Sequence, residues 1–398
     1  MKKYSRYKPS NIEWIGDIPE HWDVKVLKRL AKICNGQDHK KVWDANGQFP
    51  IIGTGGTFGY TDSYLHEGPS VVLGRKGTID KPQYMETPFW SVDTAYYTNI
   101  FPSTNPRYFY HLCTTINFEL YKYGSAVPSM SQEVLNQIPF AIPDNIKEQT
   151  AIANYLDKKT KEIDQLIDDK KQLLKLVEEE KKAIIYHAVT KGINPDSEMK
   201  DSYIEWIGKI PKHWELKKLK YVFNSLNNIR IPLSSEERGK MLERTYDYYG
   251  ASGIIDKVES YLFDEPLLLI GEDGANLLTR SSRLVFIAKG KYWVNNHAHI
   301  LKPKFGTLEY YSELLELFDF SLWVTGSAQP KLTSENLMNI QIIVPPVEEQ
   351  ELIMKFLEIE FAKVNSKMKK IKKLIKLLTE YRFALISEVV TGKVKVID

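Results

Sequence analysis

Cysteine is scarce in this chain, with only Cys34 and Cys113 among 398 residues. These two residues form neither the close spacing of a zinc site nor a disulfide framework, so a reducing cytoplasm is the expected environment. No run of 18 apolar residues occurs, which argues against a membrane-spanning helix. The first residues, MKKYSRYKPSN, lack the apolar segment of a secretory signal.

An excess of charge of one sign is also missing. The chain has 54 Lys and Arg residues against 51 Asp and Glu residues, a net charge of +3. The whole chain therefore has no strong electrostatic attraction to nucleic acid, and a basic binding surface would have to be local. With 43% hydrophobic and 26% charged residues, the composition is typical of a soluble globular protein, and the length allows two or three domains.

Sequence motifs of catalysis are missing as well. A Walker A loop needs Gly-x4-Gly-Lys-Ser/Thr, and the nearest segment, Gly74–Thr78, has the wrong spacing. The only Pro-Pro pair, in Val344–Val347, lacks the flanking polar and aromatic residues that hold the target amine in amino-methyltransferases. His297 and His299 have no partners at metal-ligand spacing. We expect neither a catalytic site nor a metal site.

Repetition is the dominant feature of what is present. IEWIGDIPEHW at residues 12–22 recurs as IEWIGKIPKHW at residues 204–214, and GSA-x-P occurs from Gly124 and again from Gly326. A module that is present twice in one chain indicates two similar tasks on two related surfaces.

Each half begins with a region of short apolar runs separated by Gly, Pro and Asn. Ser70–Gly74 and Pro139–Pro143 are predicted to be strands, and residues 107–119 are predicted to form a helix. Leu267–Gly271 takes the place of Ser70–Gly74 in the second half. The predicted division of the chain is a first domain at 1–143, a long helix at 144–190, a linker at 191–202, a second domain at 203–345 and a second long helix at 346–390.

The two long helices carry a repeating apolar pattern. Apolar residues recur at alternating spacings of three and four, which are the a and d positions of a coiled coil. Thr160, Lys170 and Lys181 interrupt the pattern in the first helix. The predicted seam residues are Leu156, Ile163, Ile167, Leu174, Val177, Ile184, Leu357, Phe361, Val364, Met368, Ile371, Ile375, Leu378 and Leu385.

The two long helices are similar in length and align at a constant offset in sequence, which favours packing of the two helices on each other. Packing of each helix on its own domain is the alternative. An antiparallel pair of about 40 residues would be about 60 Å long and would place the two domains at opposite ends. The predicted fold is therefore mixed α/β (α+β), with two globular domains separated by a pair of long antiparallel coiled-coil helices with pseudo-twofold symmetry.

Two glycine loops are candidates for contact with nucleic acid. The loops LGRKGT and IGEDGANL both follow an apolar strand and contain Gly-x-x-Gly, which lets the backbone approach a ligand closely. Arg75 and Lys76 in the first loop suit phosphates or a guanine edge. Glu272 and Asp273 stand there in the second loop and would repel phosphate. Tight turns that only hold each domain together are the alternative.

A second pair of segments, SAVPSMSQ and SAQPKLTS, precedes a predicted helix start in each half. Their small hydroxyls suit a phosphate-facing helix N terminus, while helix capping by Ser131 or Thr333 is the alternative, and both roles can coexist. The candidate DNA-binding residues from the two pairs of segments are Arg75, Lys76, Thr78, Ser129, Gln132, Asn276, Arg280, Arg283, Lys331 and Thr333.

The motifs IEWIG-x-IP-x-HW, GSA-x-P, IPFAIP/IIVPP, EQ-x-x-I and VTG together resemble the specificity subunit of type I restriction-modification systems, over nearly the whole chain. The resemblance implies a prokaryotic, cytoplasmic, non-catalytic subunit whose two target-recognition domains each read half of an asymmetric, bipartite double-stranded DNA site. It implies two modification subunits, which use S-adenosylmethionine to methylate adenine, and restriction subunits, which use ATP and magnesium. No cofactor is expected in this chain.

Two other functions stay open at this point, a degenerate DNA methyltransferase and a coiled-coil assembly protein that does not read bases. The different charges of the two glycine loops predict two different half-site sequences. A helix pair of fixed length predicts half-sites at a fixed gap, about one helical turn apart on the same face of the duplex.

Overall fold

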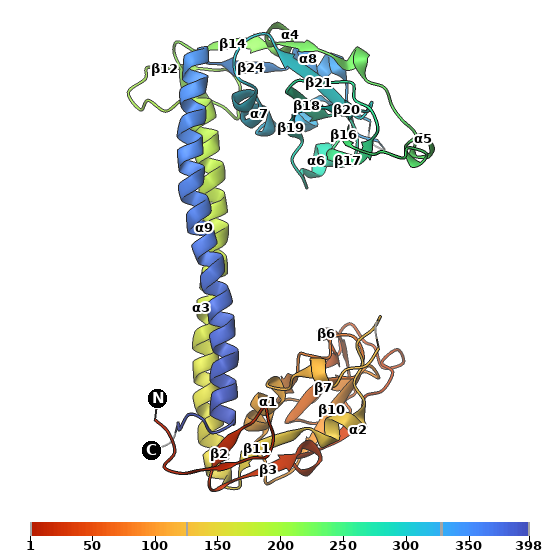
Figure 1. Cartoon of the computed structure of the whole chain (residues 1–398), viewed down its shortest axis with the longest axis vertical. Helices are drawn as coiled ribbons and strands as arrows, with labels where there is room; N and C mark the ends of the chain where they lie inside the picture. The colour runs from red at the N-terminus through yellow and green to blue at the C-terminus, as the bar shows by residue number, and fades with distance from the viewer. Residues whose placement is uncertain (1, 125, 327–328, 397–398) are drawn as a thin grey trace. The chain divides into compact units, whose positions relative to one another are not determined.

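The computed structural model describes residues 2–124, 126–326 and 329–396. The chain divides into two compact units, of which unit 1 is Met1–Gln172 with Ile371–Asp398 and unit 2 is Leu173–Lys370. Each unit therefore contains one globular domain and a part of each long helix (Figure 1). Three residues of the repeated GSA-x-P segments lie outside the described residues, namely Ser125, Ser327 and Ala328.

Unit 1 is built mainly of short strands. Its strands are β1 (Tyr7–Pro9), β2 (Asp17–Pro19), β3 (Trp22–Val26), β4 (Ala31–Asn35), β5 (Phe49–Gly53), β6 (Gly56–Thr61), β7 (Ser70–Gly74), β8 (Gln83–Met85), β9 (Trp90–Ser91), β10 (Ala95–Ile100) and β11 (Pro139–Pro143). Its helical segments are η1 (Leu27–Arg29), α1 (Pro106–Thr114), η2 (Phe118–Leu120), α2 (Gln132–Gln137) and the first part of α3 (Ile146–Lys191). An antiparallel sheet of order β4-β10-β7-β8 lies beside a three-stranded sheet of order β6-β5-β9 and the two-stranded sheets β1-β2 and β11-β3.

Unit 2 repeats this arrangement. Its strands are β12 (Met199–Asp201), β13 (Lys209–Pro211), β14 (Glu215–Lys218), β15 (Phe223–Ser225), β16 (Tyr246–Gly250), β17 (Gly253–Val258), β18 (Leu267–Gly271), β19 (Val285–Ala288), β20 (Tyr292–Val294), β21 (Ala298–Pro303), β22 (Val324–Thr325), β23 (Lys331–Leu332) and β24 (Gln341–Val344). Its helical segments are α4 (Leu219–Val222), η3 (Asn227–Ile229), α5 (Ser235–Gly239), α6 (Asn276–Thr279), α7 (Leu308–Glu316), η4 (Phe320–Trp323), α8 (Ser334–Asn339) and the first part of α9 (Val347–Val390). The sheets β15-β21-β18-β19, β17-β16-β20, β12-β13 and β14-β24 match those of unit 1 in order, so the predicted mixed α/β duplication is confirmed.

The helix predicted at residues 107–119 is shorter than expected. Asn105 caps α1 by accepting a hydrogen bond from the backbone of Tyr108, and Pro106 occupies the first turn, where its missing N–H costs nothing. The helix ends at Thr114, because the hydroxyls of Thr114 and Thr115 donate back to carbonyls one turn earlier, at 2.7 and 2.8 Å. Such local hydrogen bonds compete with continuation of the helix.

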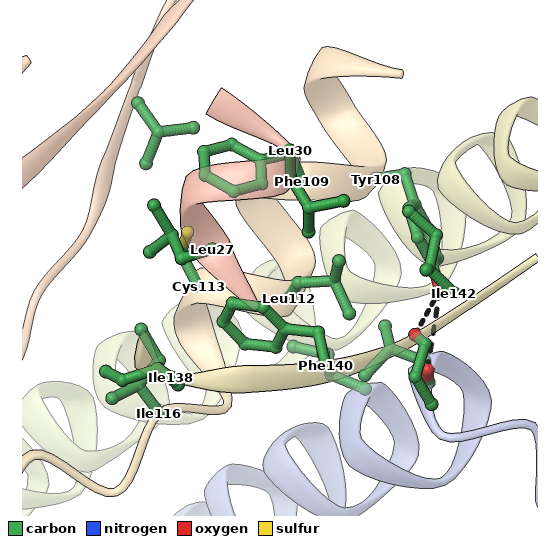
Figure 2. Close-up of a cluster of buried hydrophobic side chains, with 14 of the residues drawn as sticks. Leu27, Leu30, Tyr108, Phe109, Leu112, Cys113, Ile116, Ile138, Phe140 and Ile142 are labelled. Carbon is green, nitrogen blue, oxygen red and sulfur yellow. Dashed lines mark hydrogen bonds between the residues drawn. The ribbon is translucent and has the colours of Figure 1, made fainter. Parts of the chain in front are cut away.

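Helix α1 supplies much of the core of unit 1. Its side chains Phe109 and Leu112 are buried with Phe140 of β11 and with Leu27 of η1 (Figure 2). The hydroxyl of Tyr108 lies 3.1 Å from the carbonyl oxygen of Ala141 and 3.4 Å from that of Val390, the last residue of α9. Burial raises the pKa of Tyr108 well above its ordinary value, so this hydroxyl remains a hydrogen-bond donor.

The two long helices pack against each other in the antiparallel direction. In unit 1 the guanidinium of Arg382 pairs with both carboxylate oxygens of Asp164, at 2.8 and 3.2 Å. In unit 2 the ammonium of Lys367 lies 2.7 Å from the carboxylate of Glu180. A step of 16 residues forward along α3 (164 to 180) matches a step of 15 residues back along α9 (382 to 367), which confirms the predicted direction.

The residues of the predicted seam are shielded from solvent. All 14 seam residues are buried or half-buried, and Leu156, Val177 and Leu357 are at most 1% exposed. Lys181 is accommodated because its ammonium lies 4.7 Å from the ring centre of Phe361, a distance at which a cation is attracted to an aromatic face. Among the described residues, no helix is both long enough and apolar enough to cross a membrane.

The end of a long helix contacts the repeated IEWIG segment in both units. In unit 2 the helix α3 runs on along the chain into this segment, whereas in unit 1 the segment lies near the amino terminus and contacts the end of α9. In unit 2 the ammonium of Lys191, the last residue of α3, donates to the carbonyl oxygen of Lys209 at 2.6 Å. In unit 1 the ammonium of Lys393, just after α9, donates to the equivalent carbonyl oxygen of Asp17. The hydroxyl of Tyr7 also donates to the carbonyl oxygen of Gly392 at 3.1 Å. The amino-terminal segment of the chain thus contacts the carboxyl-terminal end of α9 within unit 1.

The repeated His-Trp and Glu-Gln dipeptides are partners in space. In unit 2 the carboxylate of Glu349 accepts hydrogen bonds from the indole of Trp214 at 2.9 Å and from His213 at 2.7 Å. The amide of Gln350 accepts from the backbone of Thr307 and donates to the carbonyl of Pro345, both at 3.0 Å. These bonds fix the first turn of α9 to the domain.

Unit 1 makes the same bonds around the start of α3. Glu148 accepts from the indole of Trp22 at 3.0 Å, and Gln149 accepts from the backbone of Asn105 and donates to the carbonyl of Pro143, both at 2.8 Å. The pairing explains why both dipeptides recur.

Removal of Glu349 should destabilise unit 2. Glu349→Ala leaves the fully buried indole of Trp214 without its acceptor, and a buried unsatisfied donor costs roughly 1–3 kcal/mol. Glu349→Gln retains an acceptor and should recover part of that loss. The free energy of unfolding in urea measures both effects, and Glu348→Ala, an exposed residue of the same helical turn, is the matched control. Equal stability of Glu349→Ala and the control would contradict the role of this contact.

Candidate nucleic-acid interface

The candidate site of unit 1 lies at one edge of the four-stranded sheet. Strand β4 ends at Asn35, opposite Tyr96, and β7 ends at Gly74, opposite Ala95, where β10 begins. The loops after β4 and β7 therefore meet the loop before β10. We call this region the loop edge of unit 1 and define it by residues 36–43, 53–58, 75–78, 91–94 and 128–131. The corresponding loop edge of unit 2 comprises residues 226–245, 250–255, 272–283, 295–297 and 329–333.

The structure brings together the two segments that the sequence singled out separately. The backbone N–H of Gly77 donates to the carbonyl of Pro128, and that of Met130 donates to the carbonyl of Arg75, both at 2.9 Å. In unit 2 Gly274 donates to Pro330 at 3.1 Å, and Leu332 to Glu272 at 2.8 Å. Gly77 and Gly274 have φ angles of +87° and +96°, which glycine adopts without the steric cost that other residues meet. The backbone frame is therefore the same in both units.

Unit 1 presents cations that are not held in ion pairs, although Lys40 helps to lower the pKa of Asp38 through its backbone hydrogen bond and its charge. The guanidinium of Arg75 lies 5.8 Å from the ring centre of Tyr96 and 3.3 Å from the carbonyl oxygen of Asp93. Lys76, Lys40 and Lys41 are exposed. None of these four cations forms an ion pair within residues 2–124, 126–326 and 329–396. Exposed, unpaired cations at one edge can contact phosphates.

The loop edge of unit 1 also carries an exposed aromatic cluster, and sequence reasoning did not find it. Phe58 and Trp43 are each 47% exposed, and the ring of His39 is 5.0 Å from that of Phe58. Phe58 lies over Gly53, where an added Cβ would approach its ring to 3.1 Å. The glycine-rich hairpin GTGGTFG could have indicated this cluster in the sequence, because glycines allow a large side chain to lie across the backbone. Ile255, which is 54% exposed, takes the place of Phe58 in unit 2.

The acidic loop of unit 2 is neutralised by its own neighbours. Glu272 pairs with Arg230 and lies 3.2 Å from the ammonium of Lys331, while Asp273 lies 2.7 Å from His297. Burial raises the pKa of Glu272, but the hydrogen bonds from Arg230 and Lys331 and the charge of Arg230 outweigh it, so that the pKa is lowered. Glu272 therefore stays ionised, and both carboxylates have partners inside the loop edge.

The other predicted basic residues of unit 2 are tied to α7. Arg280 lies 3.0 Å from Glu316, and Arg283 lies 2.8 Å from Glu313. Asn276 closes its own loop, since its side-chain oxygen accepts from the backbone of Ser282 at 3.0 Å. The structure thus brings Lys331 to Glu272 but holds Asn276, Arg280 and Arg283 in other contacts.

The remaining predicted residues have local partners. Ser131 caps α2 and Thr333 caps α8, each accepting at 3.2 Å from the backbone N–H of the third residue of the helix, so the predicted capping is confirmed. Gln132 donates to the carbonyl of Ile33 at 3.0 Å, and Ser129 donates to that of Val127 at 3.2 Å. Thr78 is half-buried beside them. Within the described part of the chain, no group of three or more His, Cys, Asp or Glu residues could hold a metal ion.

His299 is a neutral hydrogen-bonding link in unit 2. The side-chain oxygen of Asn227 accepts from the backbone of Ile300 at 2.9 Å, so its amide nitrogen faces Nδ1 of His299, also at 2.9 Å. Nδ1 therefore accepts, and the proton lies on Nε2, which donates to the carbonyl of Leu332 at 2.7 Å. In unit 1 Tyr96 takes this place, and its hydroxyl donates to the carbonyl of Met130 at 3.4 Å.

Acid should destabilise unit 2 through His299. Burial lowers the pKa of His299 below its ordinary value of 6.5, with the charges of Arg230 and Lys331 acting in the same direction. Below about pH 6.5 the unfolded chain then binds more protons than the folded one, so stability that is present above this pH is lost as the pH falls.

His299→Tyr, which introduces the residue of unit 1, should remove this contribution, while His111, also lowered in pKa by burial, stays in both proteins. Urea midpoints at about pH 7.5 and about pH 5.5 measure the difference. An identical pH dependence of the variant and the wild-type chain would contradict the assignment.

Comparison with known proteins identifies related sequences in both halves of the chain. Residues 19–176 and 211–377 each match the family described as the type I restriction modification DNA specificity domain.

The curated relatives are named as specificity subunits of type I restriction enzymes. A putative type I restriction enzyme specificity subunit of Haemophilus influenzae is 36% identical over 146 residues, which are 36% of either chain. The EcoprrI specificity subunit of Escherichia coli is 29% identical over 39% of this chain and 40% of its own. The MjaIX specificity subunit of Methanocaldococcus jannaschii is 24% identical over 96% of this chain and 95% of its own. The chain thus spans little more than a third of the length of the first two relatives and nearly all of the third.

Solved structures share the fold. A chain from a study of complex assembly and conformational transition in the type I restriction-modification system has a TM-score of 0.70 at 13% identity, covering 95% of this chain and 99% of its own. The HsdS subunit from Thermoanaerobacter tengcongensis has a TM-score of 0.51 at 13% identity, covering 95% and 98%. At such low identity the likeness concerns the fold alone.

Proposed function

Because this chain belongs to the type I restriction-modification DNA specificity family, we propose that each of its two units reads one half of an asymmetric, bipartite site in double-stranded DNA. Specificity subunits are the non-catalytic members of type I systems, in agreement with the prediction from the sequence. In the proposed complex, two modification subunits hold S-adenosylmethionine and methylate adenine, and restriction subunits use ATP and magnesium. The chain itself provides recognition and assembly, without a cofactor.

One observation carries this proposal, namely that the two loop edges share a backbone frame and differ in side chains. The paired loops have the same hydrogen bonds in both units, but Arg75 and Lys76 are replaced by Glu272 and Asp273. Base identity is read by side chains in a groove, whereas the backbone frame sets their position. A shared frame with different readers is what two unlike half-sites require.

The two loop edges also differ in their electrostatics. Arg75 and Lys76 of unit 1 have no carboxylate partner among the described residues, whereas in unit 2 Lys331 is paired with Glu272. Free cations attract phosphates without regard to sequence, while paired cations contribute less to this attraction. We propose that unit 1 supplies the larger share of the salt-dependent affinity.

The long helices supply the fixed gap in this proposal. Helices of 46 and 44 residues are about 65–70 Å long, and their interlocked seam resists sliding. The pseudo-twofold arrangement of the two readers, predicted from the duplication, belongs to the same proposal.

Exchange of one recognition domain tests the assignment of domains to half-sites. Replacement of residues 12–143 by the corresponding region of another specificity subunit should change one half of the methylated sequence and leave the other half unchanged. The measurement is a map of methylated adenines in DNA from cells that express the hybrid with its modification subunit. A change in both halves, or in neither, would contradict one unit per half-site.

The same system separates the alternatives. A coiled-coil assembly protein would bind its partners but show equal affinity for all duplexes at a given salt concentration. A degenerate methyltransferase would bind S-adenosylmethionine as the isolated chain, and we expect no such binding.

Loss of the free cations should weaken DNA binding in a salt-dependent manner. Arg75→Ala with Lys76→Ala removes up to two phosphate contacts, so the slope of log affinity against log salt concentration should fall by about 1.8, at about 0.9 per contact. Lys28→Ala with Arg29→Ala removes the same charge near the opposite end of β4 and is the matched control. Titrations of the isolated chain with duplex DNA at several salt concentrations measure the slope. The same fall in both variants would mean that the loop edge is not the phosphate-binding surface.

A further inference from the structure

A second surface is shared by the two units and lies outside the loop edges. In unit 2 an open groove of about 650 Å³ runs between the repeated IEWIG segment and the residues that follow α7. Its apolar lining includes Tyr203, Trp206, Leu322 and Trp323. Tyr203 is 90% exposed and Leu322 is 79% exposed. Large apolar side chains exposed around a groove mark interaction sites.

The groove has a preformed floor. The ring of Trp206 contacts that of Phe318 edge to face, with their centres 4.8 Å apart. The carbonyl of Trp206 accepts a hydrogen bond from the hydroxyl of Tyr186 on α3, and the carbonyl of Trp323 accepts one from Asn336, both at 2.8 Å. Both walls are therefore held by bonds to the rest of the unit, so little order would have to be created on binding.

Tyr203 has an unusual backbone conformation at the rim of this groove. Its φ angle is +54°, a left-handed conformation that aromatic residues rarely adopt. The backbone is held there because the N–H of Tyr203 donates to the carboxylate of Asp201 at 2.7 Å. The constraint presents an aromatic ring almost entirely to solvent. Asn11, in the same place of unit 1, has a φ angle of +61°.

Unit 1 presents the matching residues. Trp14, in the same IEWIG segment, is 42% exposed, and Leu120, which takes the place of Leu322 after α1, is 67% exposed. The acidic residue of the segment, Glu13 in unit 1 and Glu205 in unit 2, is exposed in both and forms no ion pair in the part of the chain that the structure describes. The surface therefore combines apolar side chains with an unpaired carboxylate in both units.

The likeness of these surfaces contrasts with the difference between the loop edges. Two different DNA half-sites have to be read by different side chains. Two copies of one partner protein, in contrast, have to bind to similar surfaces on the two units. The unpaired carboxylates at the rim repel phosphate and attract Lys or Arg side chains, which favours a basic protein segment over DNA as the occupant. We propose that each unit docks one modification subunit through this surface, and that the docked segment carries an apolar side chain flanked by basic residues. This inference rests on the proposed function and adds the surface by which the partner is held.

The test counts the modification subunits that are bound per chain. Leu322→Asp places a charge in the apolar groove of unit 2 and should reduce the complex from two modification subunits to one, as measured by native mass spectrometry. Leu120→Asp should do the same through unit 1, and the double variant should bind none. Tyr221→Asp, at another position of unit 2 that is 61% exposed and lies outside the loop edge, should retain two subunits. Leu322→Met, which keeps the apolar contact, should also retain two.

The outcomes separate this inference from the proposed function. Retention of two modification subunits by the Leu120→Asp and Leu322→Asp double variant would overturn the docking surface, while the proposed function would stand. Failure of the wild-type chain to bind any modification subunit would instead count against the proposed function. Unchanged duplex binding and an unchanged thermal transition of the isolated variant chain show that the fold persists, so a lost subunit then reports the docking surface.

Discussion

The buried hydrogen bonds at the first turn of each long helix are the constraint on which the rest of the structure depends. Glu148 and Glu349 accept from an indole that the sequence places more than 100 residues away, and the neighbouring glutamines tie the same turn to backbone groups of the domain. A polar group that is buried in this way is costly to leave without its partner, so helix and domain have one favoured arrangement. The direction in which each helix leaves its domain is thereby fixed.

Each domain in turn needs both helices. The hydroxyl of Tyr108 in α1 lies within hydrogen-bonding distance of the last residue of α9, and the hydroxyl of Tyr310 in α7 donates to Val189 near the end of α3 at 2.8 Å. The start of one helix and the end of the other therefore share one hydrophobic core in each unit. Antiparallel pairing follows from this sharing, because each unit must receive one helix start and one helix end. The seam of apolar residues stabilises the pair, but the ends of the helices determine its register.

Much of the fold could be predicted from the sequence, because it depends on local patterns. Heptad spacing located the seam, and the repeated segments located two equivalent domains. The pairing of Arg230 with Glu272 could not be predicted, since 42 residues separate them and charged residues pair over many alternative distances. The carboxylate partners of Arg280 and Arg283 on α7 could not be predicted for the same reason, and the predicted contact of these residues with DNA stays a prediction. Phe58 was missed because a single exposed aromatic residue has no periodicity, and its position depends on Gly53 beneath it.

In the proposed complex with DNA, the distribution of charge would give the two units different ways of binding the duplex. The loop edge of unit 1 carries exposed cations and an aromatic cluster, so affinity would come from phosphate contacts and specificity from apolar contact with bases. In unit 2 the charges of the glycine loop are satisfied internally, so a duplex gains less from general attraction and must gain more from a correct local fit. Attraction by unit 1 would hold the chain on any duplex while unit 2 samples the sequence beside it. The proposed readers of the asymmetric site would therefore differ in charge as well as in the bases that they recognise.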